Sequence, residues 1–187
     1  MAKVVERIED DDLVLRARTQ AEALGRLYER HYDRIFRFCV YRLFDKEIAE
    51  DVTSTVFLEV ARKIRGFAGQ TEQDFANWLY AIAANQANAY IRKTSRRKKL
   101  LIRAARSMQT SNDTDDPPEP DWPSLYTAIL KLKPKHQTLV TLRFFENLPH
   151  EQIAQILNVR QAAVRVTLHR ILGKLRRHLQ TVVDGDV

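Results

Sequence analysis

Hydrophobic residues recur every three or four positions through most of the chain, which is the spacing of one face of an α-helix. This pattern predicts a first helix from about Thr19 to Leu43, a second from about Lys46 to Ile64 and a third from about Gln73 to Arg97. The interval 66–71 between the second and third helices contains two glycines and interrupts the pattern. The residues predicted to face inward are Leu24, Leu27, Tyr28, Ile35, Phe36, Cys39, Leu43, Val52, Val56, Val60, Ile64, Phe75, Trp78, Leu79, Ile82 and Ala83.

The second half of the chain predicts four further helices, from about Ser124 to Lys133, Pro134 to Phe145, His150 to Leu157 and Arg160 to Gln180. Pro134 suits the first turn of a helix, because an N–H group at that position has no partner within the helix. Asn158 lies between the last two helices and tolerates the left-handed backbone of a sharp turn. The buried stripe predicted for the last helix consists of Val164, Leu168, Ile171, Leu175 and Leu179.

An acidic stretch divides the chain in two. Residues 107–121 hold five carboxylates and three prolines, and after Met108 they show no apolar periodicity, as is typical of a solvated linker. We therefore predict an all-α fold of two small helical domains, at 19–106 and 122–180, joined by an acidic flexible linker at 107–121. Residues 1–18 are predicted to be an acidic N-terminal tail, and residues 181–187 a C-terminal tail.

Composition indicates the class of partner. The 187 residues carry a formal net charge of +7, which favours a polyanion, either nucleic acid or an acidic membrane surface. No stretch is apolar over the roughly 18 residues that a membrane span needs, and the acidic run 9–12 argues against a secretory or transit signal. Cys39 is the only cysteine, so we expect a cytoplasmic protein without membrane insertion. The apolar run around Cys39 favours a packed thiol, and a redox sensor is the alternative.

Residues 151–177 have the pattern of a DNA-binding helix-turn-helix, with a short helix, a tight turn and a longer helix. Ala154 is small enough to let two helices cross closely. A helix with basic outward residues can lie in a major groove, where arginine reads guanine and neighbouring side chains bind phosphates. The alternative is a solvated basic face on an ordinary helical hairpin. Once the buried stripe is assigned, the outward residues are Gln161, Arg165, Val166, His169, Arg170 and Lys174.

A second basic signal follows the third predicted helix. Residues 92–99 read RKTSRRKK, and no carboxylate occurs between Ile91 and Arg106. The run extends a helix that contains aromatic and amide side chains, and these groups beside positive charge suit a nucleic-acid strand with exposed bases. A disordered arm or a membrane-surface patch is the alternative.

Four fragments, in this order, resemble the extracytoplasmic-function (ECF) sigma factors, a family of bacterial transcription-initiation factors. AEDVTSTVFL at 49–58 resembles the family's polymerase-binding helix, and FANWLYAIAAN at 75–85 resembles its promoter-melting helix. LKP at 132–134 resembles the opening of the family's second domain, and 153–176 resembles its helix-turn-helix. The resemblance spans nearly the whole chain and implies sigma domain 2 at 19–106 and sigma domain 4 at 122–180.

The resemblance also implies the contacts of the first domain. The face that binds the clamp helices of the polymerase's largest subunit carries Asp51, Ser54, Thr55 and Phe57. Without the resemblance, Asp51 would be interpreted as a plain solvated carboxylate.

The loop after that helix is implied to capture a flipped base of the −10 element, with Phe67 in the loop and Asn85 facing it. An opened base needs stacking and hydrogen bonds to its edge, which these two residue types supply. Considered alone, Asn85 could instead be a helix-capping or core amide. The residues implied to hold duplex phosphates upstream are Arg92, Lys93, Arg96 and Arg97.

In the second domain, Arg165, His169 and Arg170 are implied to read bases of the −35 element, beside Val166. The residues implied to lie nearer the DNA backbone are Gln161, Thr167 and Lys174. The acidic linker is implied to run through the RNA-exit path of the polymerase. Ala162 and Ala163 replace a common Gly-Thr pair of the family, which leaves the −35 sequence open.

The chain departs from the family at the clamp face, because Thr55 stands where an acidic residue is usual and Ser54 where glutamine is common. One interpretation is a slightly weaker contact. The other is a phosphorylation site at Thr55, whose added charge turns on polymerase binding. The implied partners are core RNA polymerase, promoter DNA and either an anti-sigma factor or a Ser/Thr kinase.

An enzyme is not expected. GFAG at 66–69 is a bare GxxG without the strands of a KH fold, and His150-Glu151 lacks the second histidine of a zinc-protease motif because position 154 is alanine. Neither a cofactor nor a metal is expected. The remaining alternative to a sigma factor is a stand-alone helix-turn-helix regulator, which would bind duplex DNA without polymerase.

Overall fold

The computed structural model describes residues 11–94 and 122–183, with the side chains of 124–179 in the second segment. Every regular element in these two segments is helical, which confirms the all-α prediction. No helix among them is long and apolar enough to cross a membrane. The predicted linker at 107–121, together with Arg96 and Arg97, lies outside the described residues.

The first half is built from α2 (Ala21–Leu43), α3 (Lys46–Lys63) and α4 (Glu72–Lys93), with a short 3-10 turn, η1 (Ile64–Gly66), after α3. Side-chain caps explain where two of these helices begin. Asp45 accepts a hydrogen bond from the Ile48 N–H at 3.0 Å, and Thr71 and Asp74 form a reciprocal capping box at the start of α4.

The core of the first half lies between α2, α3 and α4, and the predicted stripes supply most of it. The thiol of Cys39 is fully buried, and this burial raises its pKa to about 11, so it is a packed side chain and not a reactive thiolate. Tyr28 is the main exception to the predicted stripe, because it is 43% exposed. Leu13 and Val14 lie in a helical turn at 11–16 and are buried, so the packed part begins before the predicted Thr19.

The second half contains α6 (Trp122–Leu130), α7 (Pro134–Val140), α8 (His150–Leu157) and α9 (Gln161–Val183). The single helix predicted over 134–145 is regular only to Val140. It continues as a π-helical turn, η3 (Thr141–Phe145), which closes with a 3.0 Å hydrogen bond from the Glu146 N–H to the Thr141 carbonyl. The wider turn changes the direction in which the residues after it point.

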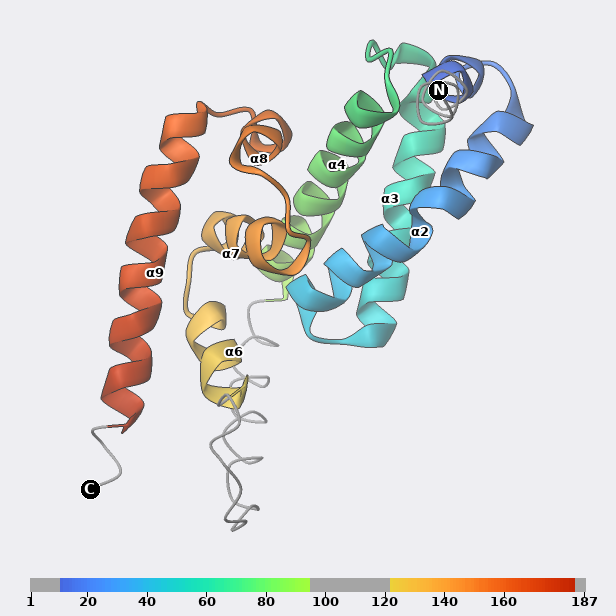
Figure 1. Cartoon of the computed structure of the whole chain (residues 1–187). Helices are drawn as coiled ribbons and strands as arrows, with labels where there is room; N and C mark the ends of the chain where they lie inside the picture. The colour runs from blue at the N-terminus through green and yellow to red at the C-terminus, as the bar shows by residue number, and fades with distance from the viewer. Residues whose placement is uncertain (1–10, 95–121, 184–187) are drawn as a thin grey trace, which may run out of the picture.

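The two halves pack against each other. Helix α4 contacts α7 and α8, and α2 contacts η3. In Figure 1, α7 and α8 therefore lie between α4 and α9. The helical patterns along the chain predict the elements of each half but not this contact.

Candidate nucleic-acid and polymerase interfaces

The helix-turn-helix of the second half is formed by α8 and α9. Asn158 adopts the left-handed conformation at the turn, with φ 50° and ψ 54°, as predicted. The Val159 N–H donates to the Ala154 carbonyl at 2.9 Å, which closes the end of α8. Burial of Val164, Leu168, Ile171 and Leu175 confirms the predicted stripe of α9, and Leu179 is half-buried.

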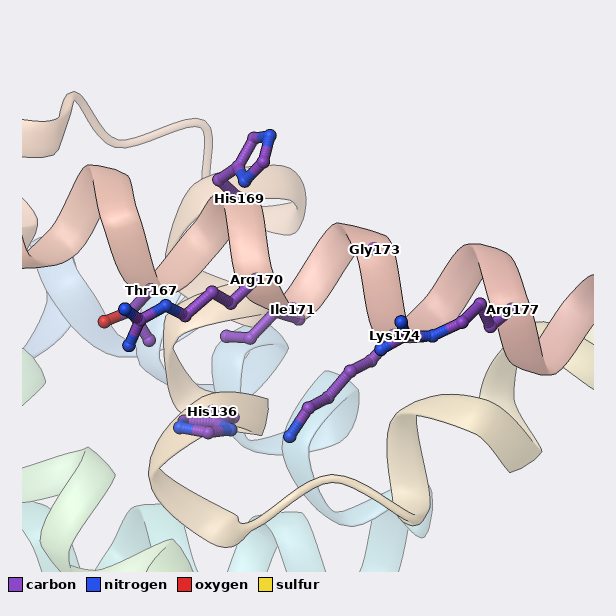
Figure 2. Close-up of a pocket in the computed structure, with 8 residues that line it drawn as sticks. All are labelled: His136, Thr167, His169, Arg170, Ile171, Gly173, Lys174 and Arg177. Atoms are coloured by element: carbon purple, nitrogen blue, oxygen red, sulfur yellow. The ribbon is translucent and has the colours of Figure 1, made fainter.

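The predicted outward residues of α9 are exposed to solvent. They are Gln161, Arg165, Val166, His169, Arg170 and Lys174, and Thr167 is half-buried. Figure 2 shows that His169 projects away from His136 of α7, whereas Lys174 reaches toward it. His169 and Lys174 therefore leave α9 along different edges.

Between α9 and α7 lies a hollow of about 460 Å³, whose basic lining side chains include His136, Arg170 and Lys174. The pKa of His136 is lowered, first by burial and then by the positive charges of Lys174 and Lys133. At neutral pH its imidazole is therefore uncharged. His136 is not among the predicted DNA-contact residues, because it lies on α7, outside the helix-turn-helix.

The loop after η1 has one well-defined arrangement. The ring of Phe67 stacks on Trp78, with 4.6 Å between centroids, and meets Phe75 edge-on at 6.1 Å. The N–H groups of Gln70 and Thr71 both donate to Asp74 Oδ2 at 3.1 Å. The hydrogen bond with the Thr71 side chain is the main reason that the pKa of Asp74 is lowered, and the two backbone N–H groups lower it further.

Gly69 is required for this arrangement of the loop. A Cβ at this position would clash with the ring of Phe67 and would lie 2.6 Å from Asp74 Cβ. The carbonyl of Gly69 also accepts a hydrogen bond from Arg18, which ties the loop to the N-terminal segment.

The structure does not bring Phe67 and Asn85 into one pocket. Asn85 is exposed on α4 and lines a hollow of about 540 Å³ whose other walls come from α7, α8 and α9. Phe67 lies beside Trp78, which precedes Asn85 by about two helical turns. Arg92 and Lys93 are exposed at the end of α4.

A further amide beside the loop is Asn77, which directly precedes Trp78 and has no role in the sequence predictions. Asn77 lines a third hollow together with loop residues 68–71 and Gln155 of α8. Its side-chain N–H donates to Gln155 Oε1 at 2.7 Å. Gln155 of the second half therefore accepts a hydrogen bond from the Asn77 amide beside the loop.

On α3, Asp51, Ser54 and Thr55 are all exposed. The Thr55 hydroxyl donates to the Asp51 carbonyl at 2.9 Å. Phe57 is buried, because the ring of Tyr28 covers it edge-on at 4.7 Å. The aromatic and aliphatic surface here is therefore presented by Tyr28 and by Leu58, which is 52% exposed.

A helix-turn-helix with an exposed basic face, packed on a separate helical body, defines a DNA-binding protein of transcription. The family model described as Sigma-70 region 2 matches residues 27–97, and the model described as Sigma-70, region 4 matches residues 123–175. Together these matches cover more than half of the chain, which therefore belongs to the sigma-70 family of RNA polymerase sigma factors, as an ECF sigma factor. Sigma factors of this family are non-enzymatic factors that direct promoter-specific transcription initiation.

Relatives with similar sequences carry the same function in their names. The chain is 33% identical over 175 residues to the ECF RNA polymerase sigma factor BldN of Streptomyces coelicolor, a match that covers 90% of this chain and 65% of BldN. It is 27% identical over 164 residues to the RNA polymerase sigma factor YlaC of Bacillus subtilis, covering 84% of this chain and 92% of YlaC. The chain thus spans slightly less than two thirds of BldN.

Solved structures share the fold. CnrH in complex with the cytosolic domain of CnrY is similar with a TM-score of 0.67 at 19% identity, over 95% of this chain and 99% of the other. The sigma factor RpoE in complex with the anti-sigma factor NepR from Bartonella quintana is similar with a TM-score of 0.58 at 15% identity, over 83% of this chain and 96% of the other.

Proposed function

We propose that the chain binds core RNA polymerase through the exposed face of α3 and reads the promoter with two separate surfaces, α4 for the −10 element and α9 for the −35 element. The observation that carries this proposal is the exposed basic face of α9, which includes Arg165, Arg170 and Lys174. Arg92 and Lys93 would add phosphate contacts upstream of the −10 element.

Promoter binding with and without core polymerase tests this proposal. The holoenzyme is expected to bind a promoter fragment specifically, whereas the chain alone shows only weak, salt-sensitive binding. Specific, tight binding of duplex DNA by the chain alone would instead identify a stand-alone regulator.

For the −35 element, we propose that Arg170 reads a base and that Lys174, one helical turn further along α9, holds a phosphate. Replacing Arg170 with alanine should then cost roughly 1–3 kcal/mol, and only on promoters that carry the preferred base. Replacing Lys174 with alanine is the comparison. It should weaken all sequences about equally and reduce the salt dependence.

Holoenzyme affinities measured across a set of −35 variants distinguish these two roles. If Arg170→Ala weakens every sequence to the same extent, Arg170 binds a phosphate and the assignment is wrong.

At the clamp face, we propose that Asp51, Ser54 and Thr55 contact the polymerase together with Tyr28 and Leu58. The last two supply the apolar area that the buried Phe57 cannot supply directly. The side chain of Thr55 is exposed one helical turn after Asp51, and its hydroxyl binds the Asp51 carbonyl, so a phosphoryl group at Thr55 would add to the negative charge of Asp51 on this face. Phosphorylation adds roughly −1.5 to −2 charges.

Replacing Thr55 with glutamate should therefore tighten binding to core polymerase, and Thr55→Ala should lower transcription in cells. One exposed ion pair contributes about 0–1 kcal/mol, so an increase of up to about fivefold is expected. Gln20→Glu, which adds the same charge at an exposed position outside α3, is the control. If Thr55→Ala transcribes like the unaltered chain and Thr55→Glu gains nothing, Thr55 is no switch.

An anti-sigma protein is a further proposed partner, and the cytoplasm the proposed location. RpoE, which shares the fold, is in complex with the anti-sigma factor NepR, and CnrH, which also shares it, is in complex with the cytosolic domain of CnrY. An anti-sigma protein and phosphorylation at Thr55 would act on different steps, because the first sequesters the chain and the second changes its affinity for polymerase.

A further inference from the structure

The loop at 67–71 is bound by an N-terminal segment that is distant from it in the sequence. This segment, at 11–18, packs on the first half through Leu13, Val14 and Ala17, which are all buried. In Figure 1 it is drawn in blue, at the end of the first half where α3 leads into α4. The segment and the loop therefore belong to the same folded body.

Two hydrogen bonds join this segment to the backbone of the loop and of the residue after it. Arg18 Nη2 donates to the Gly69 carbonyl, and Asp11 Oδ1 accepts from the Glu72 N–H at 2.7 Å. The Glu72 N–H belongs to the first turn of α4, where N–H groups have no partner within the helix. Asp11 therefore supplies an acceptor that the helix itself lacks.

The two N-terminal contacts complete a continuous run of bound backbone groups. The N–H groups of Gln70 and Thr71, which lie between Gly69 and Glu72, both donate to Asp74 of α4. Each of the four residues from 69 to 72 thus has a backbone group bound by a side chain from elsewhere. Because α4 supplies only the two middle contacts, the ends of this run depend on the N-terminal segment.

The arginine of this segment is not what packing alone would favour. Arg18 is half-buried, and its Nε is buried without a hydrogen-bond partner among the described residues. A buried donor without a partner lowers stability. An apolar side chain would avoid this cost but could not bind the Gly69 carbonyl. The arginine therefore serves the contact with the loop.

We propose that Asp11 and Arg18 are positioning residues for base capture, because they hold the loop at 67–71 in one shape before DNA binds. A loop that is already ordered binds a base without first losing conformational freedom, which favours the bound state. Neither residue needs to touch DNA for this role. The effect on base capture rests on the proposed reading of the −10 element, in which this loop captures a flipped base. The order of the loop in the free chain does not.

Hydrogen exchange of the free chain tests whether the N-terminal contacts hold the loop. Arg18→Ala should raise the exchange rates of the Gln70 and Thr71 N–H groups about fivefold, the factor that one ordinary hydrogen bond contributes to an equilibrium. Arg18→Lys keeps a donor and should restore most of the protection. Arg16→Ala removes an exposed arginine of the same segment, which pairs with Asp12, and is the control that should change nothing.

Promoters with a premelted −10 bubble and one abasic nucleotide test the role in base capture. Moving the abasic nucleotide through the element identifies the captured base, because its removal weakens binding by the unaltered holoenzyme. Holoenzymes with Arg18→Ala or Asp11→Ala should bind the intact bubble about fivefold more weakly than the unaltered one. All three should bind the bubble that lacks the captured base equally well. Arg16→Ala and Asp12→Ala, at exposed positions, are the controls.

A general structural defect would weaken binding to both bubbles alike. The positioning role is therefore overturned if the fivefold loss of Arg18→Ala persists on the bubble without the captured base. It is also overturned if Arg18→Ala leaves the loop as protected as Arg16→Ala does. If no abasic position weakens the unaltered holoenzyme, the loop captures no base, and the proposed function fails together with the positioning role. Faster exchange in Arg18→Ala distinguishes that failure from a failure of the N-terminal contacts.

Discussion

Replacing Asn85 with alanine is expected to slow open-complex formation about tenfold or more, while polymerase binding and −35 contact stay intact. Asn85 is exposed on α4, so its amide can bind the edge of an unstacked base. Loss of such base-edge hydrogen bonds costs roughly 1–3 kcal/mol, and about 1.4 kcal/mol corresponds to tenfold. Gln86→Ala, which removes the neighbouring amide, is the control.

Permanganate footprinting of the holoenzyme measures this effect. A promoter with a premelted −10 bubble should restore part of the lost rate, because the cost of unstacking the base is then lower. Unchanged strand opening would remove Asn85 from the proposed contact. Phe67→Ala is a less selective test, because Phe67 also packs on Trp78 and Phe75 and its removal disturbs the whole loop.

Leu79→Ala is expected to destabilise the first half by about 2–5 kcal/mol, because it leaves a cavity between α2, α3 and α4. Leu79 is fully buried, whereas Leu58, subject to the same substitution, is 52% exposed. Leu58→Ala should therefore change the free energy of unfolding by no more than about 0.5 kcal/mol.

Urea unfolding followed by tryptophan fluorescence separates the two variants, because Trp78 reports on the first half. Equal effects of the two substitutions would mean that Leu79 does not pack in the core. A weaker affinity of Leu58→Ala for core polymerase would in addition support Leu58 as part of the clamp face.

The local elements were predictable because they depend on spacing along the chain. The boundaries of α8 and the buried stripe of α9 follow from apolar residues at helical intervals around Asn158, and the structure confirms them. The π-helical turn at 141–145 was not predictable, because its residues continue the same apolar pattern as the regular helix before it.

The contact between the halves could not be predicted in the same way. The side chains at its centre are polar, and polar side chains normally indicate a surface exposed to solvent. One signal was present: Arg42 continues the inward stripe of Ile35 and Cys39, which places an arginine on a buried face. The sequence does not indicate which distant residue meets it. The roles predicted for Phe67 and Asn85 rest on the family resemblance. Only the structure shows that Phe67 packs on Trp78, about two turns of α4 before Asn85.

The burial of Arg42 and Glu146 also bears on exchanging domains between sigma factors. A chimera that takes its second half from a relative would set Arg42 against whatever residue replaces Gln137, and Arg37 against whatever replaces Glu146. A mismatch would leave a buried charge without its partner and weaken the contact between the halves, whereas a carboxylate opposite Arg42 would strengthen it. The halves are therefore interchangeable modules only when both sides of this contact are transplanted together.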